Sequence, residues 1–497
     1  MVMKQEAIII GAGVAGLAAS IRLSCMGYKV YVFEKNACPG GKLSEFSQDG
    51  YRFDAGPSLF TQPGNIEALF QLAGEPMADF FRYRKVPVAC HYFFSNGKRL
   101  KAWADKDKFA AEMEAQLGEP PENITQYLAK SAELYNNVGE LFLKHSLHRP
   151  ADFSLAEISR ALGTVKLPFL FQSLNGYNQH HFKTPEAAQL FNRYATYNGS
   201  NPYKAPAMLS LIPHLELNEG TFYPEGGMIS ITNALYKLAV KNGVEFHFHC
   251  PVEQILVNKG KVAGIKAAGK DYAAGLVVSN QDVYFTYKNL LKNEQRAAKV
   301  LKQERSSSAL IFYWGITHDF KELGLHNIFF STDYAAEFRH IFHEGNVWED
   351  PTVYINITSK MEGGMAPQGC ENWFVMVNVP ANTGQNWQEL KQSTRKKVIE
   401  KLSRILGVDI AGLIATEETL DPVTIESKTM SYMGSLYGTS SNSKMAAFFR
   451  HPNGGKGYKG LYFVGGSVHP GGGIPLCLCS AAIMTDMVAK DFPFTTY

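Results

Sequence analysis

The sequence has little of what marks secreted, metal-binding or membrane-spanning proteins. Its 497 residues contain seven cysteines, an odd number, and no CxxC pair. This pattern predicts neither a disulfide framework nor a zinc site nor a thioredoxin-like motif, and it favours a reducing compartment. The first residues, MVMKQEAIII, lack the basic region, apolar core and cleavage site of a secretory signal. The uncharged stretch at 7–21 contains three glycines and is shorter than the about 20 residues that cross a bilayer.

Charge balance and composition exclude two further classes of protein. Lysine and arginine number 49 against 46 aspartates and glutamates, a net charge of +3, which argues against a dedicated nucleic-acid-binding protein. Hydrophobic residues make up 45% and aromatic residues 12% of the chain, so it is not a disordered protein. At roughly 100–200 residues per domain, the length predicts two to four domains, or two large ones.

The first part of the chain predicts a dinucleotide-binding unit. A short apolar run at 7–10 predicts a buried strand, 15–26 predicts a helix, and 29–33 predicts a second strand. Glu34 stands at the end of that strand. Its separation along the chain from Gly11 is close to the about 20 residues that a dinucleotide-binding fold places between its first glycine and its acidic residue. The turn between the first strand and the helix has the GxGxxG spacing at Gly11, Gly13 and Gly16.

Each residue type in this pattern has a physical role. Gly11 permits a tight turn, Gly13 lets the backbone approach a pyrophosphate, and Gly16 lets helix and strand pack closely. The helix N-terminus faces the negative charge, and Glu34 offers its carboxylate to ribose hydroxyls. We therefore expect a bound dinucleotide; the alternative is a strand–turn–helix without a ligand. GKGYKG at 455–460 has the same spacing but precedes a strand, so no nucleotide is expected there.

Further glycine-rich segments favour FAD over NAD. PGGK at 39–42 follows the acid closely, and FDAGPS occupies 53–58. Near the other end, a strand at 461–464 runs into two glycines, and Pro475 stands where a helix would begin. The dipole of that helix, contributing about 0.3–1 kcal/mol, would stabilise a reduced, anionic flavin ring.

Several motifs, spread along nearly the whole chain, resemble one family. They are GAGVAGLAAS at 11–20, PGGK at 39–42, FDAGPS at 53–58, NGSNPYKAP at 198–206, FYPEGGM at 222–228, VSNQD at 278–282, GSLYG at 434–438 and LYFVGGSVHPGGGIP at 461–475. At these residues the chain resembles the carotenoid (phytoene-type) desaturases, within the wider amine-oxidase-like FAD superfamily. The resemblance implies an FAD-dependent oxidoreductase that takes a hydride and a proton from a carotenoid and so adds a carbon–carbon double bond.

The resemblance also implies an α/β fold of mixed α+β character in two discontinuous parts. One is a Rossmann-like FAD-binding domain of the p-hydroxybenzoate-hydroxylase and amine-oxidase type. The other is a mixed-sheet substrate domain with a helical, membrane-associating segment at about 155–215. The expected boundaries are 1–70, 221–289 and 436–497 for the FAD-binding domain, and 71–220 and 290–435 for the substrate domain.

Local patterns predict the remaining elements. Alternation and turn residues predict four strands in the middle FAD segment and a hairpin around Asn96-Gly97. Longer apolar runs predict strands of a mixed sheet, followed by a helix with basic residues on its exposed face. The strands are expected at 244–249, 252–257, 261–266, 271–278, 86–94, 98–102, 308–316, 352–358 and 373–379, and the helix at 388–406.

The motifs and the resemblance assign the candidate site residues. FAD is expected to contact Gly11, Gly13, Ala15, Gly16, Glu34, Lys35, Gly41, Lys42, Gly56, Pro57, Ser58, Val252, Gly466, Ser467, Gly473 and Ile474. Two titratable residues in flavin-side motifs, Glu225 and His469, are candidate catalytic groups that accept a proton or orient a water. For both, the alternative is ordinary loop packing. No metal site is expected.

Two departures from the family pattern narrow the expected reaction. Related phytoene desaturases have been proposed to use an acid and an arginine before the NP turn, and the matching positions here are Thr184 and Ala188. Arginine is common in the family where Glu225 stands. The pattern is closer to desaturases that act late, at the 3',4' bond of a hydroxylated acyclic or monocyclic carotenoid. The alternatives are a phytoene desaturase-type enzyme, another FAD oxidase of the superfamily, or a non-catalytic prenyl-binding protein of this fold.

A carotenoid substrate implies contact with a membrane surface. At about 0.8 kcal/mol for each buried CH₂-sized group, moving a roughly 40-carbon polyene from a bilayer into water costs on the order of 30 kcal/mol. The candidate entrance is LPFLFQSL at 167–174 with 206–215, where Phe169 and Phe171 would anchor at the interface; the alternative is a pair of ordinary buried helices. We expect a cytoplasmic protein, peripheral on the inner membrane face, that passes electrons to oxygen or a quinone and binds no nucleic acid.

Overall fold

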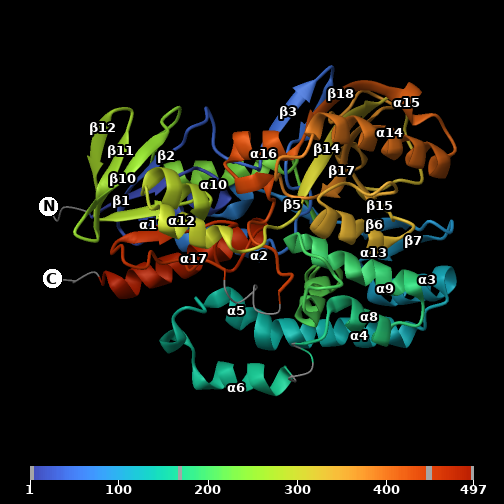
Figure 1. Cartoon of the computed structure of the whole chain (residues 1–497), viewed down its shortest axis with the longest axis horizontal. Coiled ribbons are helices and arrows are strands. Elements are labelled where there is room, and N and C mark those ends of the chain that lie inside the picture. The colour runs from blue at the N-terminus through green and yellow to red at the C-terminus, as the bar shows by residue number, and fades with distance from the viewer. Residues whose placement is uncertain (1–4, 166–168, 170, 444–449, 494–497) are drawn as a thin grey trace.

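The computed structural model describes residues 5–165, 169, 171–443 and 450–493. Two sheet-based halves lie side by side, and a group of helices lies beneath them in Figure 1. The half on the left combines elements from the blue N-terminal part, the yellow-green middle and the red C-terminal part of the chain. The chain therefore leaves this half twice and returns to it.

A parallel five-stranded sheet forms the centre of the left half. Its order is β19-β13-β1-β2-β9, and every neighbouring pair is parallel. The strands are β1 (Glu6–Ile10), β2 (Lys29–Phe33), β9 (Glu245–His247), β13 (Leu276–Ser279) and β19 (Leu461–Phe463). Because all five run in one direction, their carboxyl ends meet at a single edge, where open α/β sheets bind their ligands.

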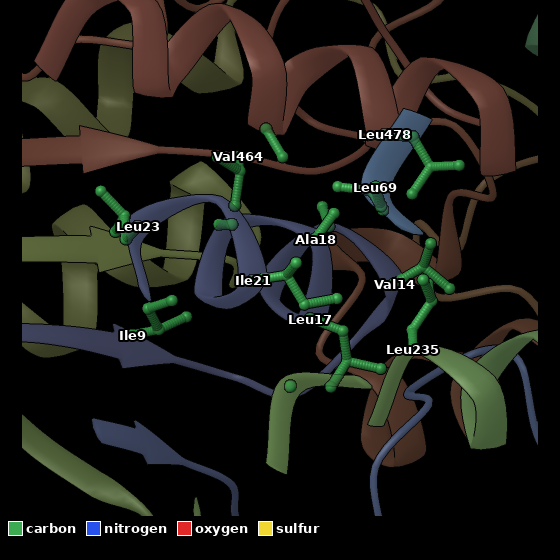
Figure 2. Packing of buried hydrophobic residues seen from close by; sticks show 14 of the residues in the cluster. Ile9, Val14, Leu17, Ala18, Ile21, Leu23, Leu69, Leu235, Val464 and Leu478 are labelled. Atoms are coloured by element: carbon green, nitrogen blue, oxygen red, sulfur yellow. The ribbon is translucent and has the colours of Figure 1, made fainter. Parts of the chain in front are cut away.

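Helix α1 (Val14–Cys25) is buried along most of its length and holds the elements around the sheet together. It packs against α10 (Ile229–Lys241) and α17 (Ile474–Asp491). Figure 2 shows Leu17 and Ile21 of α1 within this apolar cluster, and both side chains are fully buried. The packing fixes the direction of α1, so that its N-terminus stays at the carboxyl edge of the sheet.

The second half is built on a mixed seven-stranded sheet of order β18-β14-β17-β16-β15-β6-β7. Its neighbours are antiparallel except for the parallel pair of β15 and β6. Helix α14 (Trp387–Leu406) covers one face, burying Val398 and Leu402 with the strand residues Leu310 and Trp314. The strands are β6 (Val88–Phe93), β7 (Arg99–Trp103), β14 (Ser308–Ile316), β15 (His326–Phe329), β16 (Val353–Ile357), β17 (Glu371–Val379) and β18 (Ile414–Leu420).

Three small sheets complete the strand structure and correct one prediction. The run at 271–278, expected as a single strand, is two strands of different sheets: β12 (Lys270–Ala273) and β13, separated by Ala274 and Gly275. β12 is largely exposed in a hairpin, whereas β13 is fully buried, as a central parallel strand must be. The other strands are β10 (Val252–Asn258) and β11 (Lys261–Ala267) beside β12, β3 (Glu45–Gln48) with β4 (Tyr51–Asp54), and β5 (Tyr83–Lys85) with β8 (Phe222–Pro224).

Helices and short helical turns fill the space between and below the sheets. Among the described residues, none of the helices is both long enough and apolar enough to cross a bilayer. The remaining elements used below are α2 (Gly64–Ala73), α4 (Pro121–Leu134), α5 (Glu140–Lys144), α6 (Leu155–Thr164), α8 (Leu174–His181), α9 (Pro185–Asn192), α16 (Pro422–Thr429), η4 (Arg193–Asn198), η5 (Ala207–Leu211) and η6 (His214–Glu219).

Truncation of the central helix tests the packing of the left half. We expect Leu17→Ala to lower the free energy of unfolding by about 2–5 kcal/mol, because it opens a cavity in a site that cannot collapse. Leu72→Ala on α2 is the matched control, since that side chain is 48% exposed. Urea unfolding of both variants measures the difference; equal midpoints for the two would contradict this account of the core.

Candidate flavin and substrate site

A cavity of about 1060 Å³ lies where the two halves meet. Its walls include residues from the carboxyl edge of the parallel sheet, from the seven-stranded sheet and from the helices below. The volume slightly exceeds the roughly 300–1,000 Å³ of typical small-molecule pockets. One chamber can thus hold a dinucleotide together with part of a second ligand.

The turn between β1 and α1 forms the nucleotide end of the cavity. Gly11, Gly13 and Ala15 line it, whereas Gly16 does not. A Cβ on Gly16 would lie against the carbonyl oxygen of Gly11, far inside van der Waals contact. Gly16 therefore acts through packing: it lets α1 approach the turn and present its N-terminus to the ligand.

The carboxylate of Glu34 lies across this helix end. The residue is 6% exposed, its Oε2 accepts the N–H of Ala12 at 2.8 Å, and its Oε1 accepts the N–H of Asn36 at 2.9 Å. Each oxygen keeps a further lone pair for a hydroxyl donor. Glu34 and the neighbouring Lys35 both line the cavity, which fits contact with a ribose.

Asn280, within the VSNQD segment, is a site residue that was not among the predicted FAD contacts. α1 has no side-chain cap of its own, because its N-cap is Gly13. With the Asn280 Oδ1 facing the helix, it accepts the N–H groups of Gly13 and Gly16, both at 3.2 Å. Asn280 also lines the cavity. Its position directly after the buried strand β13, at the ligand-binding edge, is the signal that would have indicated it.

The PGGK and FDAGPS segments lie against each other on the next part of the wall. A Cβ on Gly56 would overlap the carbonyl oxygen of Lys42, so only glycine permits this contact. Lys42 donates to the carbonyl oxygen of Leu436 at 2.8 Å, and burial lowers the pKa of its ammonium group. The predicted residues Gly41, Lys42, Gly56, Pro57, Ser58 and Val252 all line the cavity.

The C-terminal glycine loop and the start of α17 supply the opposite wall. Gly466, Ser467, Gly473 and Ile474 line the cavity, and a Cβ on Gly473 would meet no atom within 4 Å. Arg450, which the motifs did not indicate, also lines it. Burial lowers the pKa of Arg450 to about 10. Two helix N-termini, a buried carboxylate and a buried cation together fit an FAD molecule.

Neither candidate catalytic residue lines the cavity. Glu225 is exposed and does not line the cavity, because the YPEGG turn directs it outward. His469 is buried but points toward α5: its Nε2 is 2.9 Å from the carbonyl oxygen of His145, and its ring packs on Phe142. Burial lowers the pKa of His469 to about 4. A catalytic role for either residue stays a prediction.

Apolar side chains form much of the rest of the cavity. They come from the helical region and from the inner face of the seven-stranded sheet, and include Val138, Phe142, Leu143, Met208, Leu209, Leu211, Ile212, Ile311, Ile328, Phe374 and Met376. Part of the candidate entrance at 206–215 is therefore cavity wall. Residues 167, 168 and 170 of its other segment lie outside the described residues. Phe169 packs edge-on against Tyr177, with ring centroids 5.0 Å apart, and Phe171 is 61% exposed.

Two sheet-based halves around a dinucleotide cavity at the edge of a parallel sheet define the class of an FAD-dependent oxidoreductase. The chain belongs to the family of flavin containing amine oxidoreductases, whose match spans residues 14–302. FAD is accordingly its cofactor.

Three curated relatives match almost the full chain. A 1-hydroxycarotenoid 3,4-desaturase of Flavobacterium sp. (strain P99-3) is 49% identical, over 97% of this chain and 99% of its own length. A 4,4'-diapolycopene oxygenase of Methylomonas sp. is 31% identical, over 98% of both chains. A phytoene desaturase of Fusarium fujikuroi is 30% identical, over 99% of this chain and 90% of its own.

Solved structures share the fold at low sequence identity. An oxidoreductase from Methanosarcina mazei superposes with a TM-score of 0.63 at 17% identity, covering 97% of this chain and 100% of that chain. Wild-type putrescine oxidase bound to putrescine gives 0.62 at 13% identity, covering 98% and 99%. These similarities concern the fold alone.

Substitution of Gly16 tests the nucleotide end. We expect Gly16→Val to be purified with much less flavin than the wild type, because the side chain forces α1 away from the turn and displaces its N-terminus. Gly64→Ala is the matched control: Gly64 begins α2, and a Cβ there would meet nothing within 4 Å. The ratio of flavin to protein absorbance measures the effect. A Gly16→Val protein with a full flavin complement would show that this packing does not control cofactor binding.

Proposed function

We propose that this protein is an FAD-dependent carotenoid desaturase that forms the 3,4 double bond of a 1-hydroxylated carotenoid. The observation that carries the proposal is the single cavity, in which predicted FAD-binding residues and a long apolar wall share one space. The 49% identical relative, which covers 97% of the chain, supports the same reaction. The sixteen cofactor residues named above remain part of this proposal, with Gly16 acting through packing, and Asn280 and Arg450 join them.

The protein's own part in the reaction is to bind, orient and exclude water. FAD, when bound, supplies a two-electron acceptor. The apolar walls hold the polyene in one orientation, which brings reacting atoms within about 3–3.5 Å of each other. Loss of a hydride from a carbon next to the polyene leaves a delocalised cation, and the neighbouring C–H of such a cation is acidic. A weak base or a water therefore suffices, which agrees with the positions of Glu225 and His469 away from the cavity.

Anaerobic incubation with single carotenoids tests the reaction. We expect a 1-hydroxylated carotenoid to bleach the flavin and to give a product with one more double bond, detected by chromatography and its shifted absorption. Readmission of oxygen or addition of a quinone should restore the flavin and identify the terminal acceptor. An oxygenated product would instead favour the activity named for the Methylomonas relative. Absence of bleaching with every carotenoid would contradict the proposal.

The membrane contact in this proposal is assigned to α6 and its surroundings. Leu155, Ile158 and Leu162 are 86%, 37% and 74% exposed and follow the spacing of one helix face. Phe171 adds a fourth exposed apolar side chain on the following segment. α6 lies at the lower rim of the molecule, outside the other helices (Figure 1). We propose that this surface inserts into the interfacial region of the inner membrane from the cytoplasmic side.

Charge substitution on α6 tests this surface. We expect the double variant Leu155→Glu/Leu162→Glu to lose most of its co-sedimentation with liposomes, because two carboxylates replace the apolar contact. Val423→Glu, at a residue that is 49% exposed on α16, is the control and should sediment as the wild type does. Unchanged flavin content in both variants would exclude misfolding. Equal sedimentation of all three proteins would assign the membrane contact elsewhere.

A further inference from the structure

Among the described residues, two arginines line the cavity, and only one of them has a counter-charge. Arg193 forms an ion pair with Glu216, with 3.0 Å between Nη2 and Oε1. It also donates to the hydroxyls of Tyr92 and Tyr197. For Arg450, which is 3% exposed, no carboxylate of the described residues offsets the charge, and burial alone lowers its pKa to about 10. Arg450 is thus a buried cation at physiological pH, and such a charge is costly unless a ligand neutralises it.

The guanidinium group of Arg450 is held in place and still has N–H groups to donate. Its Nη1 donates to the carbonyl oxygen of Tyr437 at 2.9 Å, and Tyr437 itself lines the cavity. The Nε and Nη2 of Arg450 have no hydrogen-bond partner among the described residues, and neither is fully enclosed, in contrast to the Nε of Arg193. A Cβ on Gly471 would lie 3.2 Å from Cζ, so the glycine loop passes close to the guanidinium group. The side chain therefore presents fixed donors at the cavity wall.

The N-terminus of α17 faces the same part of the cavity. The N-cap of this 18-residue helix is Gly473, which lines the cavity and has no side chain to accept the first N–H groups. These N–H groups carry the positive end of the helix dipole. Arg450 contacts the glycine loop at Gly471, just before the helix begins. A guanidinium group and a helix N-terminus together form a site for one anionic group.

The position of this site indicates which part of FAD it meets. The diphosphate is expected at the nucleotide end, which the glycine loop reaches at Gly465, where a Cβ would overlap the side chain of Asn280. The guanidinium group contacts the same loop further on, at Gly471. Between these two points, the ring of His469 packs on Phe142 of the apolar wall. The cation therefore lies toward the apolar part of the cavity, where FAD must present its isoalloxazine ring to a polyene.

We propose that Arg450, together with the N-terminus of α17, holds the reduced isoalloxazine ring as an anion and so raises the reduction potential of bound FAD. This inference rests on the proposed function for the place of Arg450 in the cofactor site. A hydride from the carotenoid brings two electrons and one proton to the oxidised ring, which thereby gains one negative charge on N1 and the C2 carbonyl oxygen. The carotenoid cation then loses its proton to a weak base or a water. Because the guanidinium group attracts the charged product and not the neutral oxidised ring, it makes FAD a stronger hydride acceptor.

The reduction potential of the holoenzyme tests this assignment without a carotenoid. The flavin is reduced stepwise under anaerobic conditions beside a dye of known potential, and absorption spectra give the reduced fraction of each. We expect Arg450→Met to lower the equilibrium constant for two-electron reduction about tenfold at pH 7, a shift of about 30 mV to lower potential. Arg450→Lys keeps a positive charge and should recover part of this shift. Arg395→Met is the control, because Arg395 is a partly buried arginine on α14 that pairs with Glu417 and does not line the cavity. It should keep the wild-type potential.

The pH dependence of the potential separates an effect of charge from a structural effect. Below the pH at which the free reduced ring loses its N1 proton, a ring held as an anion takes up one proton on reduction, whereas a neutral ring takes up two. Each proton changes the equilibrium constant tenfold per pH unit. The potential of the wild type should therefore fall by about 30 mV per pH unit, and that of Arg450→Met by about 60 mV.

The titratable groups around Arg450 keep their charge state over this pH range. Burial lowers the pKa of His469 to about 4 and also lowers the pKa of His148, which lies near it. Burial raises the pKa of Tyr437 to about 12 and that of Cys477, on the first turn of α17, to about 11. The slope therefore reports the protonation of the flavin ring.

The wild type alone can overturn the inference, even if a variant does not retain flavin. A wild-type slope of about 60 mV per pH unit would show that the reduced ring is neutral. An unchanged potential and slope in Arg450→Met would also contradict the inference, and weaker binding of oxidised FAD by that variant would then assign Arg450 to the diphosphate. If the wild type oxidises no carotenoid, the proposed function fails, whereas the measured potentials and the role of Arg450 stand.

Discussion

The close approach of helix α1 to the turn after β1 is the constraint on which the site depends. No side chain fits between Gly16 and the carbonyl oxygen of Gly11, and Asn280 reaches the same helix end from a distant segment. These contacts hold the free N–H groups of the helix at the edge of the parallel sheet, where they face the cavity. α17 brings a second N-terminus to the same space, so charge complementarity comes largely from the backbone.

The fold could be predicted where a pattern is complete within one short segment. The strands at 29–33 and 308–316 have the predicted bounds, because each is a short run rich in β-branched and aromatic residues. The run at 271–278 was predicted wrongly, because β12 and β13 follow each other with only Ala274 and Gly275 between them. β12 pairs with β11, whereas β13 pairs with β1 and β19. These pairings divide the run into two strands, and a local sequence pattern does not contain them.

The same distinction explains which site residues could be found. Glycine motifs act through backbone conformation, so their positions along the chain already place them at the cavity. Glu225 and His469 were chosen because they adjoin such motifs, but proximity in sequence does not set the direction of a side chain. Ser58, Tyr354 and His326 meet only through folding, since they belong to a loop of one half and two strands of the other. No spacing in the sequence relates them.

The cavity wall has a polar part, around the ion pair of Arg193 and Glu216, and apolar parts, and the two contribute differently to ligand binding. Apolar contact is non-directional and supplies affinity for any long polyene, so it discriminates poorly between chain ends. The Arg193–Glu216 pair is weak evidence for stability, because well-packed apolar residues would serve the fold equally well. What the pair and its tyrosines provide is a fixed polar surface that needs no reorganisation when a ligand arrives. Beside it, the Nε2 of His326 is buried and has no partner among the described residues, which is a local cost of this arrangement.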